Sequence, residues 1–201
     1  HQIKEIRQTE RFYNLNKKNI FRDGYRPLEY LMNENNQFNK KPSKRLSILI
    51  APSWGPNNIF EHCMETLLDI LLELDIQVTI RPHPMTIRHH KKKLAMLNNL
   101  YQHKENFCMQ INIHNRDILF QSDMLITDWS GIGIEYGIGL KKPIIYIDTP
   151  KKIHNPDADK INLTPIETEI RSEIGKIVKI DDLHKINNFI FELLQTYDKS
   201  K

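Results

Sequence analysis

Short apolar runs alternate with stretches of helical spacing along most of the chain, and this alternation is the strongest constraint on its fold. The runs are rich in Ile, Leu and Val and occupy residues 46–51, 76–80, 107–113, 124–127 and 143–147. Apolar side chains recur every three or four residues in the stretches that predict helices, which are 60–72, 88–104, 116–120, 131–140 and 183–197. Strands that are apolar on both faces and separated by helices are typical of a parallel sheet covered on both sides. The sequence therefore predicts a doubly wound, Rossmann-like α/β domain with a mostly parallel sheet.

Residues 1–20 fall outside this alternation. They are polar with spaced apolar positions, a pattern that predicts an amphipathic helix with an apolar side made of Ile3, Ile6, Phe12 and Leu15. Because the chain begins with His1 rather than Met, we expect this helix to be a connector from the missing N-terminal region of a longer protein. Residues 21–201 are then expected to form the α/β domain, with the Asn- and Lys-rich residues 33–45 as a surface loop.

Charge and composition limit the partners without choosing one. Lys and Arg number 29 against 25 Asp and Glu, and the resulting net charge of +4 suits an anionic ligand or a membrane surface. Nucleic acid is not expected, because the basic residues are not interleaved with aromatic side chains that would stack on bases. No stretch approaches the roughly 20 apolar residues that span a bilayer.

Cysteine and histidine usage points to a reducing compartment without a metal centre. Cys63 and Cys108 are too few for a disulfide scaffold, and both are expected to be buried thiols in the cytoplasm. The basic run His89–Lys93 offers two histidines with no Cys or carboxylate at ligand spacing, so no metal site is expected there.

The loops that follow the strands are the candidate site, because a doubly wound sheet binds its ligand beyond the carboxyl ends of its strands. Residues 81–84, Arg-Pro-His-Pro, follow the second predicted strand, and the two prolines fix the backbone on both sides of His83. Arg81 supplies a forked cation that suits phosphate. His83 supplies an imidazole that donates a hydrogen bond to phosphate or moves a proton near neutral pH. The alternative is a turn with a structural histidine.

Small and hydroxyl side chains follow the fourth predicted strand, at Thr127, Asp128, Ser130 and Gly131. Backbone N–H groups at a helix start bind phosphate, and Ser130 and Gly131 allow a close approach. Simple capping of the helix by Asp128 or Ser130 is the alternative. Glu135, one turn further on, accepts ribose hydroxyls or is a solvated charge.

Two further strand-end loops carry polar side chains. Ser53 and Trp54, after the first strand, are expected to line the cleft, with packing at the domain edge as the alternative for Trp54. Lys141–Lys142 and Lys151–Lys152 are short basic runs that are either solvated or meet an anionic acceptor or lipid head groups. No Walker-type glycine-rich loop and no Gly-x-Ser-x-Gly elbow occurs, so a P-loop nucleotidase or a serine hydrolase is not expected.

Three blocks of sequence, taken in order, resemble the CDP-glycerol glycerophosphotransferase family, whose members build teichoic-acid-like and capsular polymers in bacteria. The blocks are Ile50–Trp54, Arg81–Pro84 and Ser122–Ser130, the last followed by Lys142–Tyr146. The match extends over residues 21–194, nearly the whole chain. The resemblance implies the C-terminal half of a two-domain GT-B-type transferase, which is the half that binds the CDP part of the donor.

The same resemblance assigns roles to the strand-end residues. It implies that His83 is the active-site histidine at the pyrophosphate of the donor and that Glu135 holds the ribose. The phosphate neighbours that it implies are Arg81, Thr127, Asp128, Ser130 and Gly131. The implied reaction transfers a polyol phosphate from CDP-glycerol, or a related CDP-polyol, to a polymer or sugar acceptor and releases CMP. It uses no cofactor, and the enzyme is expected to be cytoplasmic, either free or peripheral on the cytoplasmic face of the inner membrane.

Two positions depart from the family pattern, and two other functions remain open. Gly55 stands where the family often has Arg, so one phosphate-binding cation is absent or supplied from elsewhere, and Gly131 replaces a second serine. A GT-B nucleotide-sugar glycosyltransferase or a UDP-sugar epimerase-like enzyme could use the same cleft. A non-catalytic module could instead dock a polymer or a membrane through its lysines. Nucleotide preference and liposome binding separate these functions.

Overall fold

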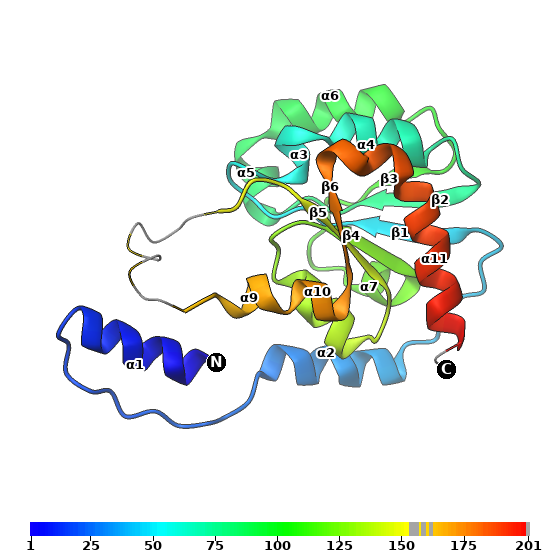
Figure 1. Ribbon diagram of the computed structural model, residues 1–201. Helices are drawn as coiled ribbons and strands as arrows, with labels where there is room; N and C mark the ends of the chain where they lie inside the picture. Colours follow the sequence, from blue (N-terminus) through cyan, green and yellow to red (C-terminus); the bar gives the residue numbers. More distant parts are fainter. Residues whose placement is uncertain (153–156, 158–159, 161–162, 200–201) are drawn as a thin grey trace.

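A six-stranded parallel sheet forms the centre of the protein (Figure 1). The structure is a computed structural model that describes residues 1–152, 157, 160 and 163–199. The strand order is β3-β2-β1-β4-β5-β6. The strands are β1 (Leu46–Ile50), β2 (Ile76–Ile80), β3 (Phe107–Met109), β4 (Met124–Thr127), β5 (Ile144–Asp148) and β6 (Lys176–Lys179). This all-parallel order confirms the predicted doubly wound fold.

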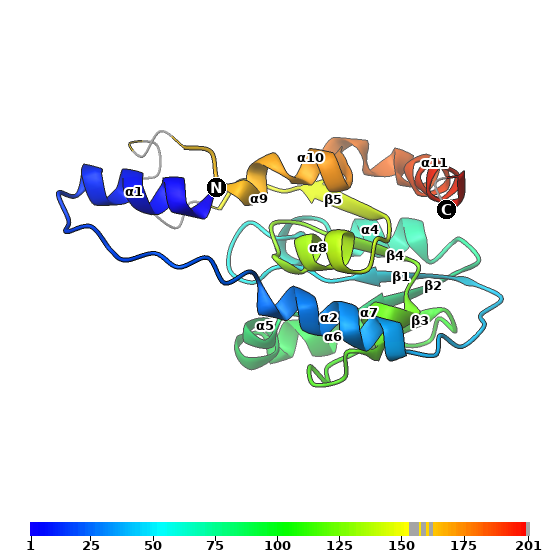
Figure 2. The same ribbon diagram turned by 90° about the horizontal axis from the view of Figure 1, so that it is seen from below.

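Helices cover both faces of the sheet, as the apolar strands require (Figures 1 and 2). One face packs against α3 (Ile59–His62), α4 (Met64–Leu71), α6 (Lys91–Tyr101) and α11 (Ile186–Lys199). The other packs against α2 (Arg26–Gln37), α7 (Asp117–Gln121), α8 (Ile132–Ile134) and the π-helix η1 (Glu135–Gly139). Successive side chains of a strand point to opposite faces, so Ile48 and Ile50 enter the first core and Leu49 enters the second.

The register of the strands brings their carboxyl ends to one rim. Ile50 of β1 lies opposite Ile80 of β2 and opposite Ile126 of β4. The chain winds outward in opposite directions from β1 and β4, so these two neighbours form the switch point at which such sheets bind ligands. The loops after β1, β2 and β4 therefore meet at the predicted position.

Several element predictions were wrong in extent. The predicted loop 33–45 begins with the last turns of α2, and the predicted helix 60–72 is divided at Cys63. The predicted helix 88–104 divides into α5 (Pro84–His89) and α6, and the strand predicted over 107–113 ends at Met109. Four of the described elements had no prediction, namely α2, α9 (Ile166–Glu169), α10 (Arg171–Ile174) and β6.

The N-terminal segment lies beside the layered domain. An amphipathic helix is present as α1 (Gln2–Phe12), although it stops before Leu15. Figure 2 shows α1 to one side of the layered domain, with its first residue beside the start of α9. There Nε2 of His1 lies 2.6 Å from the carbonyl oxygen of Thr164. None of the described helices is both long enough and apolar enough to cross a membrane.

The two cysteines differ in their environments. Cys63 is buried, as expected, and burial raises the pKa of its thiol to about 12. The prediction of a buried thiol was wrong for Cys108, which is exposed. Cys108 lies on β3, the short strand at one edge of the sheet, where one side is not covered by a neighbouring strand.

Candidate functional site

The loop after β1, residues 51–58, is held in one conformation by its own asparagine. The Asn58 side chain donates to the carbonyl oxygens of Ser53 (2.9 Å) and Gly55 (2.8 Å) and accepts from the Glu61 N–H (2.9 Å). It thereby closes the turn and caps α3. Gly55 and Asn57 have φ angles of +83° and +61°, which glycine and asparagine adopt most readily. The sequence of this loop thus specifies a fixed turn at the rim.

Asp128 ties this loop to the end of β4. Its carboxylate is completely buried and accepts from the backbone N–H of Ser53 (2.9 Å) and of Ile59 (2.8 Å). Both oxygens are therefore occupied by the protein itself. Asp128, predicted as a phosphate neighbour, acts in this structure as the residue that positions the loop after β1.

A second tether comes from the loop after β5. The Thr149 hydroxyl donates to the carbonyl oxygen of Asn57 (2.9 Å), and the Lys152 ammonium donates to the Ser53 hydroxyl and the Trp54 carbonyl oxygen. The sequence offered Lys152 only as part of a basic run, whereas the structure brings it to the rim. Three strand ends thus converge on Ser53 and Trp54, and their role in lining a cleft stays a prediction.

His83 is the N-cap of α5, and its ring has a defined tautomer. Its Nδ1 accepts a hydrogen bond from the Met85 N–H at 3.1 Å, so the neutral ring carries its proton on Nε2. Burial and the nearby Lys152 charge lower the pKa of His83 below its usual 6.5. The ring is therefore neutral at pH 7, and its Nε2–H is a hydrogen-bond donor. Of the two roles predicted for His83, this geometry favours donation to an anion over acceptance of a proton.

Trp54 and His83 stack on each other at the rim. Their ring centroids are 6.1 Å apart and the ring planes differ by 25°. Trp54 remains 48% exposed, so one strand-end loop supports the imidazole of another while both stay in contact with solvent. Trp54 thus packs against a predicted site residue from another strand-end loop.

Arg81 is a half-buried cation at the end of β2. One guanidinium nitrogen donates to the carbonyl oxygen of Ile113 at 2.8 Å. Burial and the nearby Arg116 lower the pKa of Arg81. Within the described part of the chain, no carboxylate lies within ion-pair distance of this guanidinium, so its charge is available to an anionic ligand.

The remaining predicted residues have different surroundings. The Thr127 hydroxyl is buried and donates to the Ala51 carbonyl oxygen at 2.7 Å, so it joins β4 to β1. Ser130 and Gly131 precede α8, and a Cβ atom added at Gly131 would meet nothing within 4 Å. Glu135 accepts a hydrogen bond from the Tyr25 hydroxyl at 2.7 Å, which gives its carboxylate a partner other than a ligand.

Sequence reasoning missed Arg171, a buried residue behind the loop after β4. Its guanidinium carbon lies 3.8 Å from the centre of the Trp129 ring and 5.2 Å from that of Tyr146. It also pairs with the Asp148 carboxylate at 3.3 Å. Arg171 comes from α10, for which the sequence carried no recognised pattern. It fixes Trp129 between β5 and α10 and so supports the neighbouring Asp128 and Ser130.

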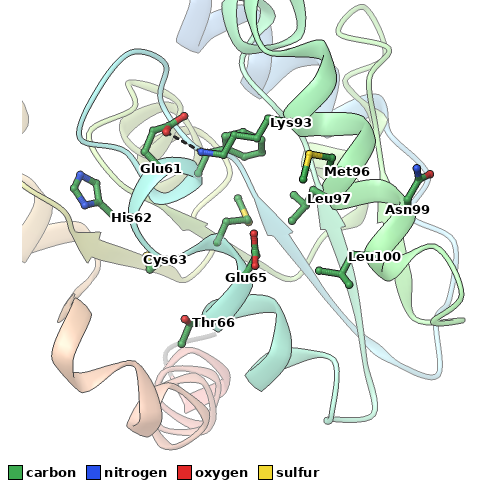
Figure 3. Close-up of a pocket in the computed structure, with 12 residues that line it drawn as sticks. Glu61, His62, Cys63, Glu65, Thr66, Lys93, Met96, Leu97, Asn99 and Leu100 are labelled. Atoms are coloured by element: carbon green, nitrogen blue, oxygen red, sulfur yellow. Dashed lines mark hydrogen bonds and ion pairs between the residues drawn. The ribbon is translucent and has the colours of Figure 1, made fainter.

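A groove of about 800 Å³ lies away from these residues, between α3–α4 and α6 (Figure 3). An ion pair between Glu61 and Lys93, at 2.7 Å, crosses one end of the groove, and Met96 and Leu100 line the α6 side (Figure 3). None of the predicted site residues lines it. The rim described above, rather than this groove, collects the predicted chemistry.

The chain matches the model of one protein family and is similar to solved structures of other proteins. The model of a family described as CDP-glycerol:poly(glycerophosphate) glycerophosphotransferase matches residues 4–155. The solved wall teichoic acid polymerase TagF is 20% identical, and the match covers 86% of this chain and 40% of that one, with a TM-score of 0.46. ADP-heptose LPS heptosyltransferase II of E. coli is 17% identical over 92% of this chain and 56% of that one, with a TM-score of 0.48.

These structural likenesses carry no functional argument at such identities and TM-scores. The chain spans about 40% of the length of the teichoic acid polymerase that it matches. None of the curated proteins matches the sequence significantly.

Proposed function

Because the chain belongs to the CDP-glycerol:poly(glycerophosphate) glycerophosphotransferase family, we propose that it is the donor-binding part of such a transferase. In this proposal residues 21–201 form the C-terminal, GT-B-type half that binds CDP-glycerol or a related CDP-polyol, and residues 1–20 connect it to the acceptor half. The acceptor is a cell-surface polymer or a sugar, and no cofactor takes part. The positive net charge of +4 suits peripheral contact with an anionic membrane surface.

The proposed reaction is a phosphoryl transfer. An acceptor hydroxyl attacks the β-phosphorus of the donor, a new P–O bond forms to the acceptor, and the bond from the β-phosphorus to the bridging oxygen breaks. CMP leaves with the electron pair of that bond. The acceptor loses its proton to a base that we place in the acceptor half. Negative charge grows on the leaving phosphate, so catalysis depends mainly on donors and cations that meet it.

The observation that supports this proposal most directly is the geometry of His83. Its Nε2–H is a fixed donor, because Nδ1 is occupied by the Met85 N–H and the ring is stacked on Trp54. The half-buried Arg81 stands at the end of the strand that leads into the same loop. In the proposed complex both side chains meet oxygens of the diphosphate, while Asp128 and Thr127 hold the loops in place. The proposed contacts of Ser130, Gly131 and Glu135 are with the phosphates and the ribose.

Calorimetry with CDP, CMP, UDP and GDP tests the donor. We expect the 201-residue chain to bind cytidine nucleotides in preference to the others, with little turnover on its own. Equal binding of all four nucleotides would contradict the CDP assignment and favour a nucleotide-sugar transferase. No nucleotide binding together with liposome binding would favour a docking module.

His83 is tested in the full-length enzyme. His83→Ala is expected to lower turnover by at least ~10² if the imidazole stabilises the transition state. His103→Ala is the matched control, because His103 is an exposed histidine that precedes β3, at the opposite end of the strands. Near-normal turnover of His83→Ala would leave the histidine with a structural role alone.

A further inference from the structure

We propose that Lys152 is a binding residue for the diphosphate of the donor, held for that purpose on the loop after β1. This inference rests on the proposed function, because it assigns a further cation to the same anionic ligand. Lys152 follows β5 in the chain, whereas Ser53 and Trp54 follow β1, so its position depends on the tertiary fold.

The ammonium group of Lys152 has one donor to spare. It carries three N–H groups, of which one is directed to the Ser53 hydroxyl and one to the Trp54 carbonyl oxygen. Among the described residues, no further hydrogen bond to this ammonium is found. The two fixed bonds hold the charge beside Trp54, which itself stacks on His83.

The Lys152 ammonium forms no ion pair with a carboxylate of the described residues. The ammonium is half-buried and no carboxylate of that part of the chain lies within 4 Å of it. Burial lowers the pKa of Lys152, and the nearby Asp128, whose two oxygens accept the Ser53 and Ile59 N–H groups, offsets that effect only in part. A half-buried cation without an ion partner has lost part of its hydration, and an anionic ligand restores that lost stabilisation.

Trp54 links Lys152 to His83. The Lys152 ammonium donates to the Trp54 carbonyl oxygen, and the Trp54 ring stacks on the His83 ring with centroids 6.1 Å apart. Burial and the Lys152 charge both lower the pKa of His83, in keeping with this proximity. In the inferred complex one phosphate oxygen meets the Nε2–H of His83 and another meets the ammonium. A dianionic or trianionic diphosphate fits this pair better than a neutral nucleoside does.

The test compares Lys152→Met with Lys151→Met in the 201-residue chain. Lys151 is the exposed neighbour, so its variant removes the same net charge without touching the rim. Calorimetry with cytidine, CDP and inorganic pyrophosphate is expected to show about 10-fold to 100-fold weaker binding of CDP and pyrophosphate to Lys152→Met. Cytidine binding is expected to be unchanged, Lys151→Met to bind like the wild type, and Lys152→Arg to recover part of the affinity.

A purely structural role for Lys152 gives a different pattern. It would weaken cytidine and CDP binding alike, and that outcome overturns the inference, as does unchanged CDP binding. Lys152→Gln, which keeps a donor for the Trp54 carbonyl oxygen, replaces Lys152→Met if the latter fails to fold. NMR titration of the His83 ring gives a readout independent of the ligand. The pKa of His83 is expected to rise in Lys152→Met and to stay constant in Lys151→Met.

The outcomes also separate this inference from the proposed function. Wild-type protein that binds pyrophosphate but shows no preference for CDP contradicts the donor assignment, and the Lys152→Met comparison with pyrophosphate still decides the inference. Wild-type protein that binds CDP with Lys152→Met equal to Lys151→Met supports the donor and overturns the role of Lys152. Wild-type protein that binds none of the three ligands overturns both.

Discussion

Asp128→Ala is expected to be among the most damaging substitutions at the rim. The carboxylate is fully buried and accepts two backbone N–H groups, at 2.9 Å from Ser53 and 2.8 Å from Ile59. A hydrogen bond to a charged group contributes about 1.5–3 kcal/mol, so losing both costs about 3–6 kcal/mol. Domains of this size have free energies of unfolding of about 5–15 kcal/mol, so the variant is expected to be close to its stability limit.

Urea unfolding followed by circular dichroism measures this change. Asp128→Asn is the more informative companion, because its amide keeps one acceptor and turns the other oxygen into a donor that faces an N–H. We expect it to lose about 2 kcal/mol or more from the free energy of unfolding. Asp182→Asn serves as the control, since Asp182 is only partly buried and its carboxylate pairs, among the described residues, with Lys185 three residues away. Its effect on stability is expected to be small, because a solvent-exposed ion pair contributes little.

The combined pattern of stability and binding decides the role of Asp128. If it positions the loop after β1, stability and CDP affinity fall together in both variants. A loss of less than about 1 kcal/mol in Asp128→Ala would refute the reasoning, because two buried bonds to a carboxylate cannot be worth so little. Unchanged stability with abolished CDP binding would instead show that Asp128 contacts the ligand directly.

Three further changes test other parts of the structure. Gly133→Ala places a Cβ atom 2.6 Å from the buried Tyr146 hydroxyl and is expected to cost about 1–3 kcal/mol of unfolding free energy. Its control, Gly131→Ala, places a Cβ atom with nothing within 4 Å and is expected to leave stability unchanged, so equal urea midpoints of the two variants would contradict the packing. His83→Asn keeps an α5 cap that does not titrate, and because the pKa of His83 is lowered in the folded state, the wild type is expected to lose stability relative to this variant as the pH falls below about 6.5. A difference that is constant between pH 8 and pH 5 would show that His83 does not titrate in this way. Arg171→Met removes the cation above the Trp129 ring and is expected to cost about 2 kcal/mol and to change tryptophan fluorescence, and an unaltered spectrum with full stability would remove its positioning role.

The sheet could be predicted from the sequence where burial is symmetrical. β1, β4 and β5 are buried on both faces over most of their length, and their unbroken Ile and Leu runs were recognised. β6 was missed because it is an edge strand in which only Val178 is buried, so its Lys-Ile-Val-Lys sequence resembles a solvated segment. α2 was missed for a related reason, since Leu31 is its one buried residue and Asn fills its last turns.

The site could be predicted by position but not by partner. The strand-end rule predicted that His83, Ser53 and Trp54 would lie near one another, and the structure brings them to one rim, because carboxyl ends of parallel strands share an edge. The bonds that define their roles join residues far apart in sequence, such as Asp128 with Ser53 across 75 positions and Lys152 with Ser53 across 99. No local spacing rule covers such pairs, and Arg171 had no local signal at all.

The distribution of charge at this rim follows from how its acids are used. Both carboxylate oxygens of Asp128 accept hydrogen bonds from backbone N–H groups, and Glu135 accepts one from the Tyr25 hydroxyl. Arg81 and Lys152, by contrast, donate only to uncharged oxygens in the described structure. The negative charges therefore stabilise the loops, and the positive charges remain for a ligand. Because the loops are held before any ligand arrives, an anion that binds here does not have to order them, and more of its binding energy appears as affinity. In the proposed function such a rim selects by phosphate charge first, and the expected preference of this chain for cytidine has to come from side chains other than these cations.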